Sequence, residues 1–266
     1  MSSKLPKAFP MFSRMLPRLF PLVLFCASVF TLAQADTWDG WLVGLNAGMA
    51  STTAKYQTGP DDKSWFNYAH QTAGMWANGH KTKTDNSAVA GLSLAYNRQT
   101  GALVYGGEMG FDFADISLGR SATYPYSQNA FGYQYNYKQN AKLNGLLTLK
   151  GRAGYAFGNS LLSATAGAAW TQLRTSMDYV DSYTGSAQYS ASHAKRDIRL
   201  GWTAGITYQY KLPSNLILKA EYQYFDFGRS SFNTPVHAAN GQYIAPMNFS
   251  AKVDVNMFTV GVEKQF

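Results

Sequence analysis

The sequence contains little charge and almost no cysteine. Charged residues make up 14% of the 266 positions, well below the roughly 25% that is usual in soluble domains, so a water-soluble globule is disfavoured. The single cysteine, Cys26, directly follows Phe25, where lipid attachment would need a small residue. Disulfide, thiol and lipid-anchor chemistry are therefore not expected in the mature chain.

Long hydrophobic runs are also scarce. The one clear run, Leu19 to Leu32, follows a basic segment and precedes the small-residue site Ala33-Gln34-Ala35. This arrangement predicts a cleaved signal peptide over 1–35 and one mature domain over 36–266, with translation starting at Met1, Met11 or Met15. A membrane-anchoring helix is the alternative, but the run is shorter than the roughly 20 residues needed to span. No later stretch approaches about 18 apolar residues, which excludes a helical membrane protein.

The mature chain also lacks a strong excess of basic residues. Of the formal +8, four positive charges belong to the predicted signal peptide, which leaves +4 without a basic stripe, so a nucleic-acid partner is not expected. Aromatic residues are abundant at 15%, with Tyr 18 and Phe 16, yet the mean hydropathy is only -0.23. Such a mixture suits a wall with one apolar and one polar face.

Strands with one apolar and one polar face are indicated by residues that alternate between apolar and polar along the sequence. Between Leu103 and Phe113 the odd positions are mostly large and apolar, whereas the even positions include Glu108 and Asp112. The same alternation predicts eight strands, at about 39–50, 87–97, 102–114, 142–157, 160–173, 197–211, 215–228 and 251–266. Tight turns are expected at 97–101, 158–159 and 212–215, and long loops at 51–86, 115–141, 174–196 and 229–250.

This pattern predicts an all-β fold, a transmembrane antiparallel up-and-down β-barrel of eight strands in the outer membrane of a Gram-negative bacterium. A soluble sandwich or lipocalin-type barrel would instead carry its large apolar residues inside and its charges outside.

Several segments resemble the small outer-membrane barrels of alphaproteobacteria, a family of surface antigens that includes hemin-binding members. The segments are 38–48, 104–111, 150–159, 201–205 and 218–228, and they touch nearly every predicted strand. The resemblance implies an OmpA-like barrel of eight strands whose C-terminal Phe266 is read as an assembly signal by the barrel-assembly machinery. It also implies outer-membrane lipids and lipopolysaccharide as surroundings.

The inward positions carry the first candidate site. Glu108, Arg152 and Glu221 each lie about six residues from the nearest tight turn, so they should share one height in the lumen. Other charges expected on the inner face are Asp112, Lys150, Arg199, Lys219 and Glu263. An ion-pair network that plugs the narrow lumen is expected. A carboxylate pair for catalysis and an ion-selective ring are the alternatives.

The predicted long loops carry the other candidates. His70, His80, His193 and His237 all fall there, where one could ligate haem, but none has metal-ligand spacing. Tyrosines crowd two of these loops, which suits either a protein-binding surface or an aromatic girdle; they are Tyr124, Tyr126, Tyr133, Tyr135, Tyr137, Tyr179, Tyr183 and Tyr189, together with Phe131.

No hydrolase elbow, P-loop, dinucleotide-binding or zinc signature is present in the sequence. The function expected is therefore a non-enzymatic surface protein with a structural role in the envelope. Binding of hemin or another host ligand through the loops, as a receptor or adhesin, is the alternative, and a small porin is the second alternative.

Overall fold

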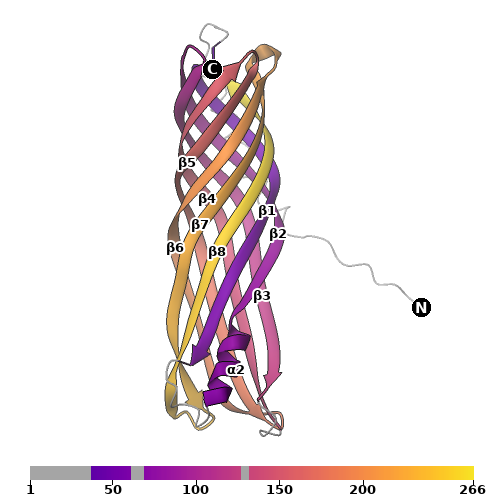
Figure 1. Cartoon of the computed structure of the whole chain (residues 1–266), viewed down its shortest axis with the longest axis vertical. Helices are drawn as coiled ribbons and strands as arrows, with labels where there is room; N and C mark the ends of the chain where they lie inside the picture. The colour runs from indigo at the N-terminus through magenta and orange to yellow at the C-terminus, as the bar shows by residue number, and fades with distance from the viewer. Residues whose placement is uncertain (1–36, 61–68, 127–131) are drawn as a thin grey trace, which may run out of the picture. The chain divides into compact units, whose positions relative to one another are not determined.

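The computed structural model describes residues 37–60, 69–126 and 132–266, so the predicted signal peptide lies outside the described residues. Residues Thr37–Gln265 form one compact unit, a closed barrel in which each strand pairs antiparallel with the next and β8 returns to β1 (Figure 1). The predicted fold class is confirmed. The strands are β1 (Gly40–Pro60), β2 (Lys81–Thr100), β3 (Leu103–Pro125), β4 (Tyr133–Phe157), β5 (Ser160–Tyr183), β6 (Ser186–Lys211), β7 (Leu216–Ala238) and β8 (Tyr243–Gln265).

The tight connections follow the sequence prediction, but the long loops do not. Short turns join β2 to β3, β4 to β5 and β6 to β7, the last through the 3-10 turn Pro213–Asn215. By contrast, most described residues of the four predicted loops belong to strands or, within 51–86, to a helix, so those loop predictions are wrong there, while 61–68 and 127–131 lie outside the described residues. β5 and β6, for example, are joined by only Thr184 and Gly185.

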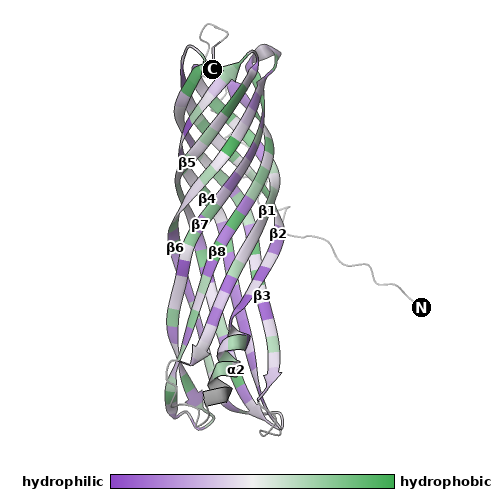
Figure 2. Cartoon of the chain, in the orientation of Figure 1, coloured by the Kyte–Doolittle hydropathy of each residue, from purple (hydrophilic) through white to green (hydrophobic). Residues whose placement is uncertain are grey.

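The polarity of the two barrel faces explains the error. We call the part of the barrel next to the tight turns the membrane half. There, outward residues such as Met109 and Phe111 are exposed, while the inward Glu108 is buried. Farther along β3, in what we call the outer half, the inward Ile116 and Leu118 are buried, while Ser117 between them is exposed. The alternation therefore continues with its polarity reversed, since the outward residues of β3 in the outer half are polar or small. More of the ribbon is coloured hydrophilic in this half than in the membrane half (Figure 2). In sequence, such a stretch is easily taken for a polar loop.

The helix α2 (Ala69–Gly79) lies at the outer end of the barrel, next to β1 (Figure 1). Met75 is fully buried, and the Trp76 ring covers Gly59, where an added Cβ would lie 2.3 Å from the ring. Asn78 donates a hydrogen bond to the Tyr135 hydroxyl at 2.8 Å. The helix thus packs onto the core of the outer half. Among the described residues, no helix is long and apolar enough to cross a membrane.

The β6–β7 ladder is interrupted in the outer half. Ser190 pairs with His237, and the next paired position is Trp202 with Asp226. β6 remains paired with β5 through this interval. Between residues 191 and 201, β6 is therefore paired with β5 but not with β7.

Candidate functional site

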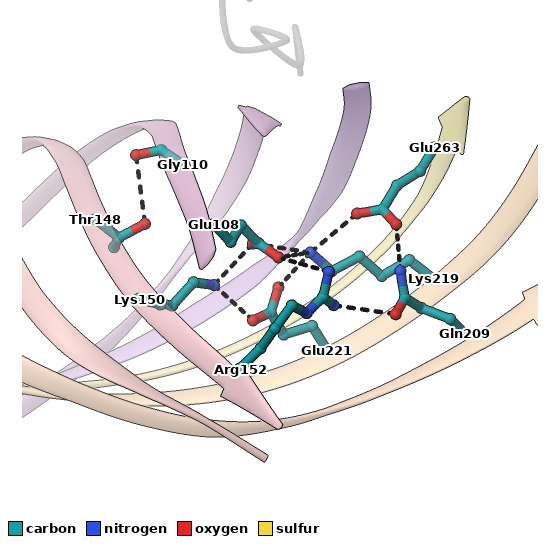
Figure 3. Close-up of polar contacts among 9 residues, drawn as sticks. All are labelled: Glu108, Gly110, Thr148, Lys150, Arg152, Gln209, Lys219, Glu221 and Glu263. Atoms are coloured by element: carbon teal, nitrogen blue, oxygen red, sulfur yellow. Dashed lines mark hydrogen bonds and ion pairs between the residues drawn. The ribbon is translucent and has the colours of Figure 1, made fainter. Parts of the chain in front are cut away.

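A buried cluster of charged side chains fills the lumen of the membrane half (Figure 3). Its members all occupy inward positions of their strands, and each charged side chain is 4% exposed or less. We call it the lumen network; it comprises Glu108 of β3, Lys150 and Arg152 of β4, Gln209 of β6, Lys219 and Glu221 of β7, and Glu263 of β8.

Glu108 and Lys219 are the two centres of the network. The Glu108 carboxylate lies 2.9 Å from the Lys150 ammonium, 2.9 Å from the Lys219 ammonium and 3.6 Å from the Arg152 guanidinium. Lys219 also lies 3.1 Å from Glu221 and 3.2 Å from Glu263. Each centre therefore faces three groups of opposite charge, which offsets the loss of hydration on burial.

The neutral Gln209 completes the network. Arg152 donates to the Gln209 side-chain oxygen at 3.0 Å, and the Gln209 amide donates to Glu263. With three carboxylates and three cations, the network has no formal net charge. Such an arrangement can close a lumen, but it leaves no unpaired carboxylate poised as a base.

The structure brings together most of the charges that the sequence places on the inner face. Glu108, Lys150, Arg152, Lys219, Glu221 and Glu263 lie in the lumen network, and Asp112 is buried nearby on β3.

Arg199 does not belong to the network, which corrects its expected place there. It lies ten residues before Gln209 on β6, or about 33 Å along the strand at roughly 3.3 Å per residue. Its guanidinium instead donates to the Arg229 backbone oxygen at 2.9 Å. Gln209 was missed by the sequence analysis, although its inward position on β6 was available as a signal.

Tyrosines fill the outer half, and all of those predicted in loops except Tyr126, which directly follows β3, lie in strands instead. Tyr126, Tyr135, Tyr137 and Tyr179 are buried in the main apolar cluster. Tyr124 and Tyr189 pack against this cluster, whereas Tyr133 and Tyr183 are exposed and lie with ring centroids 4.4 Å apart. Phe131 lies outside the described residues.

One carboxylate lies among the buried tyrosines. Tyr126 donates to the Asp181 carboxylate at 2.7 Å, and the Tyr179 hydroxyl lies 3.4 Å from the same oxygen. Burial raises the pKa of Asp181, and it also raises the pKa of Tyr126 and Tyr179. These hydroxyls stay protonated and act as donors, so the group is a polar link inside an apolar core.

The four histidines are spread over three parts of the fold. His70 lies in α2 and His80 directly after it, whereas His193 and His237 belong to β6 and β7 and not to loops. His193 packs on Phe232 with ring centroids 4.7 Å apart. Among the residues that the structure describes, no group of three or more His, Cys, Asp or Glu side chains could hold a metal ion.

Comparison of the sequence with known proteins identifies one family. The family model described as "Outer membrane protein beta-barrel domain" matches residues 20–266. The 31 kDa outer-membrane immunogenic protein of Brucella melitensis is 29% identical over 204 residues, covering 75% of this chain and 76% of that protein. The protein of the same name from Brucella suis gives the same values.

Solved structures show only a general likeness. The outer membrane protein OprG from Pseudomonas aeruginosa is 12% identical with a TM-score of 0.45, covering 86% of this chain and 96% of that one. The outer membrane protease OmpT from Escherichia coli is 12% identical with a TM-score of 0.44, covering 88% of this chain and 99% of that one.

Proposed function

The chain belongs to the outer membrane protein beta-barrel domain family and lies in the outer membrane, and from this premise we propose that it is a closed structural barrel without catalytic or pore activity. It would stabilise the envelope and present its outer half to the surroundings. The relative from Brucella is named an immunogenic outer-membrane protein, which agrees with a surface-presented barrel.

The filling of the lumen supports this proposal most directly. The lumen network occupies the membrane half, and the buried tyrosines with their apolar neighbours occupy the outer half. An eight-stranded barrel is only wide enough for its side chains to fill. An ion would therefore have to displace paired charges first and an apolar core next.

Single-channel conductance in planar bilayers tests the proposal. We expect no steady conductance from the wild-type protein at neutral pH. A variant with Lys150→Ser and Glu221→Ser removes one pair that is 2.7 Å apart without changing the net charge, and it should raise the frequency of brief openings. Steady, ion-selective conductance of the wild type would contradict the closed barrel and favour the porin alternative.

Hemin binding is the alternative from the binding class. The described histidines lie on different elements, so their arrangement does not specifically favour hemin binding. An absorbance titration of the purified protein with hemin checks it, and His237→Ala offers a single-ligand variant because His237 lines a cavity of about 290 Å³. We expect no saturable change in the hemin spectrum.

A further inference from the structure

The exterior of the outer half carries three cations in one row. Lys142 of β4 lies opposite Arg174 of β5, and Arg174 lies opposite Arg196 of β6. All three take outward positions, and both arginines are exposed. Like charges at directly opposed positions of neighbouring strands repel one another, so a bound anion would stabilise this row.

The protein itself supplies little of that charge. Lys142 forms one ion pair, with Asp115 at 3.0 Å, and both side chains are exposed to solvent. Among the described residues, no carboxylate lies within 4.0 Å of Arg174 or Arg196. Nearby Asp197 pairs with Lys195 instead, at 3.1 Å. The two arginines are therefore open to an external anion.

A second row of cations on the opposite side provides an internal comparison. Arg229 lies opposite Lys252, and Lys252 lies opposite Lys55. Here the chain does supply carboxylates, because Lys252 lies 2.9 Å from Asp226 and 3.6 Å from Asp254. Of the two rows, the one on β4, β5 and β6 keeps its charge available.

The position of the open row identifies the class of anion. On β6, Ile198 lies two residues after Arg196 and is 76% exposed, and Leu200 lies two residues farther on and is 62% exposed. These side chains belong to the apolar outward band, so the arginines lie directly beyond its outer edge. Anionic groups of membrane lipids lie at this level, and arginine binds phosphate through two parallel hydrogen bonds.

We propose that Lys142, Arg174 and Arg196 bind the phosphate groups of a phosphorylated glycolipid in the outer leaflet, with its acyl chains against Ile198 and Leu200. Phosphate would remove the repulsion within the row. The site goes beyond the structural role proposed above and does not depend on whether the lumen is closed.

Binding of purified lipopolysaccharide to the full barrel in zwitterionic micelles tests this site. The test variant is Arg174→Gln with Arg196→Gln. The matched control is Lys81→Gln with Lys83→Gln, which removes the same charge from exposed positions whose strand partners, Tyr56 and Ala54, are uncharged. We expect at least a tenfold loss of affinity in the test variant and less than a twofold change in the control.

Two further ligands distinguish the source of the phosphate. Enzymatically dephosphorylated lipopolysaccharide should bind the wild type at least tenfold more weakly. Inorganic phosphate at millimolar concentration should not compete, since it lacks acyl chains. Equal binding of the dephosphorylated lipid, or full competition by inorganic phosphate, would overturn the assignment to a phosphorylated glycolipid.

Stability provides a readout that a purely structural role would not give. In micelles without anionic lipid, the arginine variant should unfold at a higher urea concentration than the wild type, because repulsion is removed. With phosphorylated lipopolysaccharide present, the order should reverse. A variant that is less stable in both conditions, or an affinity within twofold of wild type, would refute the proposal.

Discussion

At the scale of single residues, Lys219 is the most heavily paired cation of the lumen network, with three carboxylates within 3.2 Å. Removing one partner of a buried ion pair typically costs about 3–5 kcal/mol, whereas exposed pairs contribute about 0–1 kcal/mol. Lys219→Met should therefore destabilise the barrel by about 3–5 kcal/mol, and Lys195→Met, which breaks the solvent-accessible pair with Asp197, by less than about 1 kcal/mol. Urea unfolding in lipid vesicles measures both.

A double substitution tests the coupling within the network. Glu108→Gln leaves buried cations without their carboxylate partner, and Lys219→Met leaves buried carboxylates without their cation. The two substitutions together restore equal numbers of positive and negative charges in the network. Because coupled sites are not additive, the double variant should lose less stability than the sum of the two single losses. Simple additivity would show that Glu108 and Lys219 do not interact, despite their separation of 2.9 Å.

Asp181 should make the outer half sensitive to pH. Its pKa is raised by burial, so the folded barrel holds this proton more tightly than the unfolded chain does. The resulting stability is fully present below the unfolded pKa, about 3.9, and is lost as pH rises through the folded pKa. Asp181→Asn should therefore increase stability at pH 7 and have little effect near pH 3.

The difference between wild type and the Asp181→Asn variant isolates this one group from other titrations. Urea unfolding measured from about pH 3, below the unfolded pKa of an aspartate, to about pH 8, well above it, supplies this difference. If the wild type instead became more stable relative to the Asp181→Asn variant as pH rises, the burial argument would be contradicted. That result would mean that the folded barrel favours the charged form of Asp181.

At the scale of elements, the strands of the membrane half could be predicted, and those of the outer half could not. Apolar outward residues such as Met109 and Phe111 mark the first kind of strand. In the outer half, inward tyrosines such as Tyr135 and Tyr137 alternate with polar residues. That composition is shared with adaptable loops, so only the three-dimensional pairing of β4 with β3 and β5 reveals the strand.

The candidate site was predictable to a similar extent. Counting residues from the tight turns places Glu108, Arg152 and Glu221 at one height, and they lie in one network. The contact of Glu108 with Lys219 crosses the lumen between β3 and β7, which are not neighbours. Sequence spacing carries no information on such contacts, because they depend on how the closed barrel is sheared.

Protease protection tests the strands of the outer half. Trypsin cleaves extended, accessible loops, but paired strands resist it because the bond must leave the sheet to enter the protease. The folded barrel should therefore resist cleavage after Arg120 and Lys138, which lie in β3 and β4. Mass spectrometry of the digest identifies the cut sites, and urea-unfolded protein is the control. Rapid cutting after Lys138 in folded protein would favour the loop.

At the scale of the whole molecule, the barrel is longer than a bilayer is thick. A strand of 23 residues such as β8 rises about 58 Å along the barrel axis, at about 3.3 Å per residue and a tilt of about 40°. The apolar band of an outer-membrane barrel is only about 25 Å tall. The outer half should therefore project into water, with its polar outward face hydrated and its apolar core inside.

Cysteine labelling tests this projection and the orientation together. The only natural cysteine, Cys26, lies in the predicted signal peptide, so the mature barrel should give no background. With a membrane-impermeant maleimide on intact cells, Ser231→Cys, exposed in the outer half of β7, should be labelled. Leu218→Cys in the apolar band should not be, because lipid covers it.

The opposite end of the barrel supplies the orientation control. Ser214→Cys, in the short turn between β6 and β7, should be labelled only after the outer membrane is permeabilised, since short turns of such barrels face the periplasm. Labelling of Ser214→Cys but not Ser231→Cys on intact cells would reverse the orientation. Since the row of Lys142, Arg174 and Arg196 would then face the periplasm, that result would also remove the lipopolysaccharide site, whereas the closure of the lumen would be unaffected.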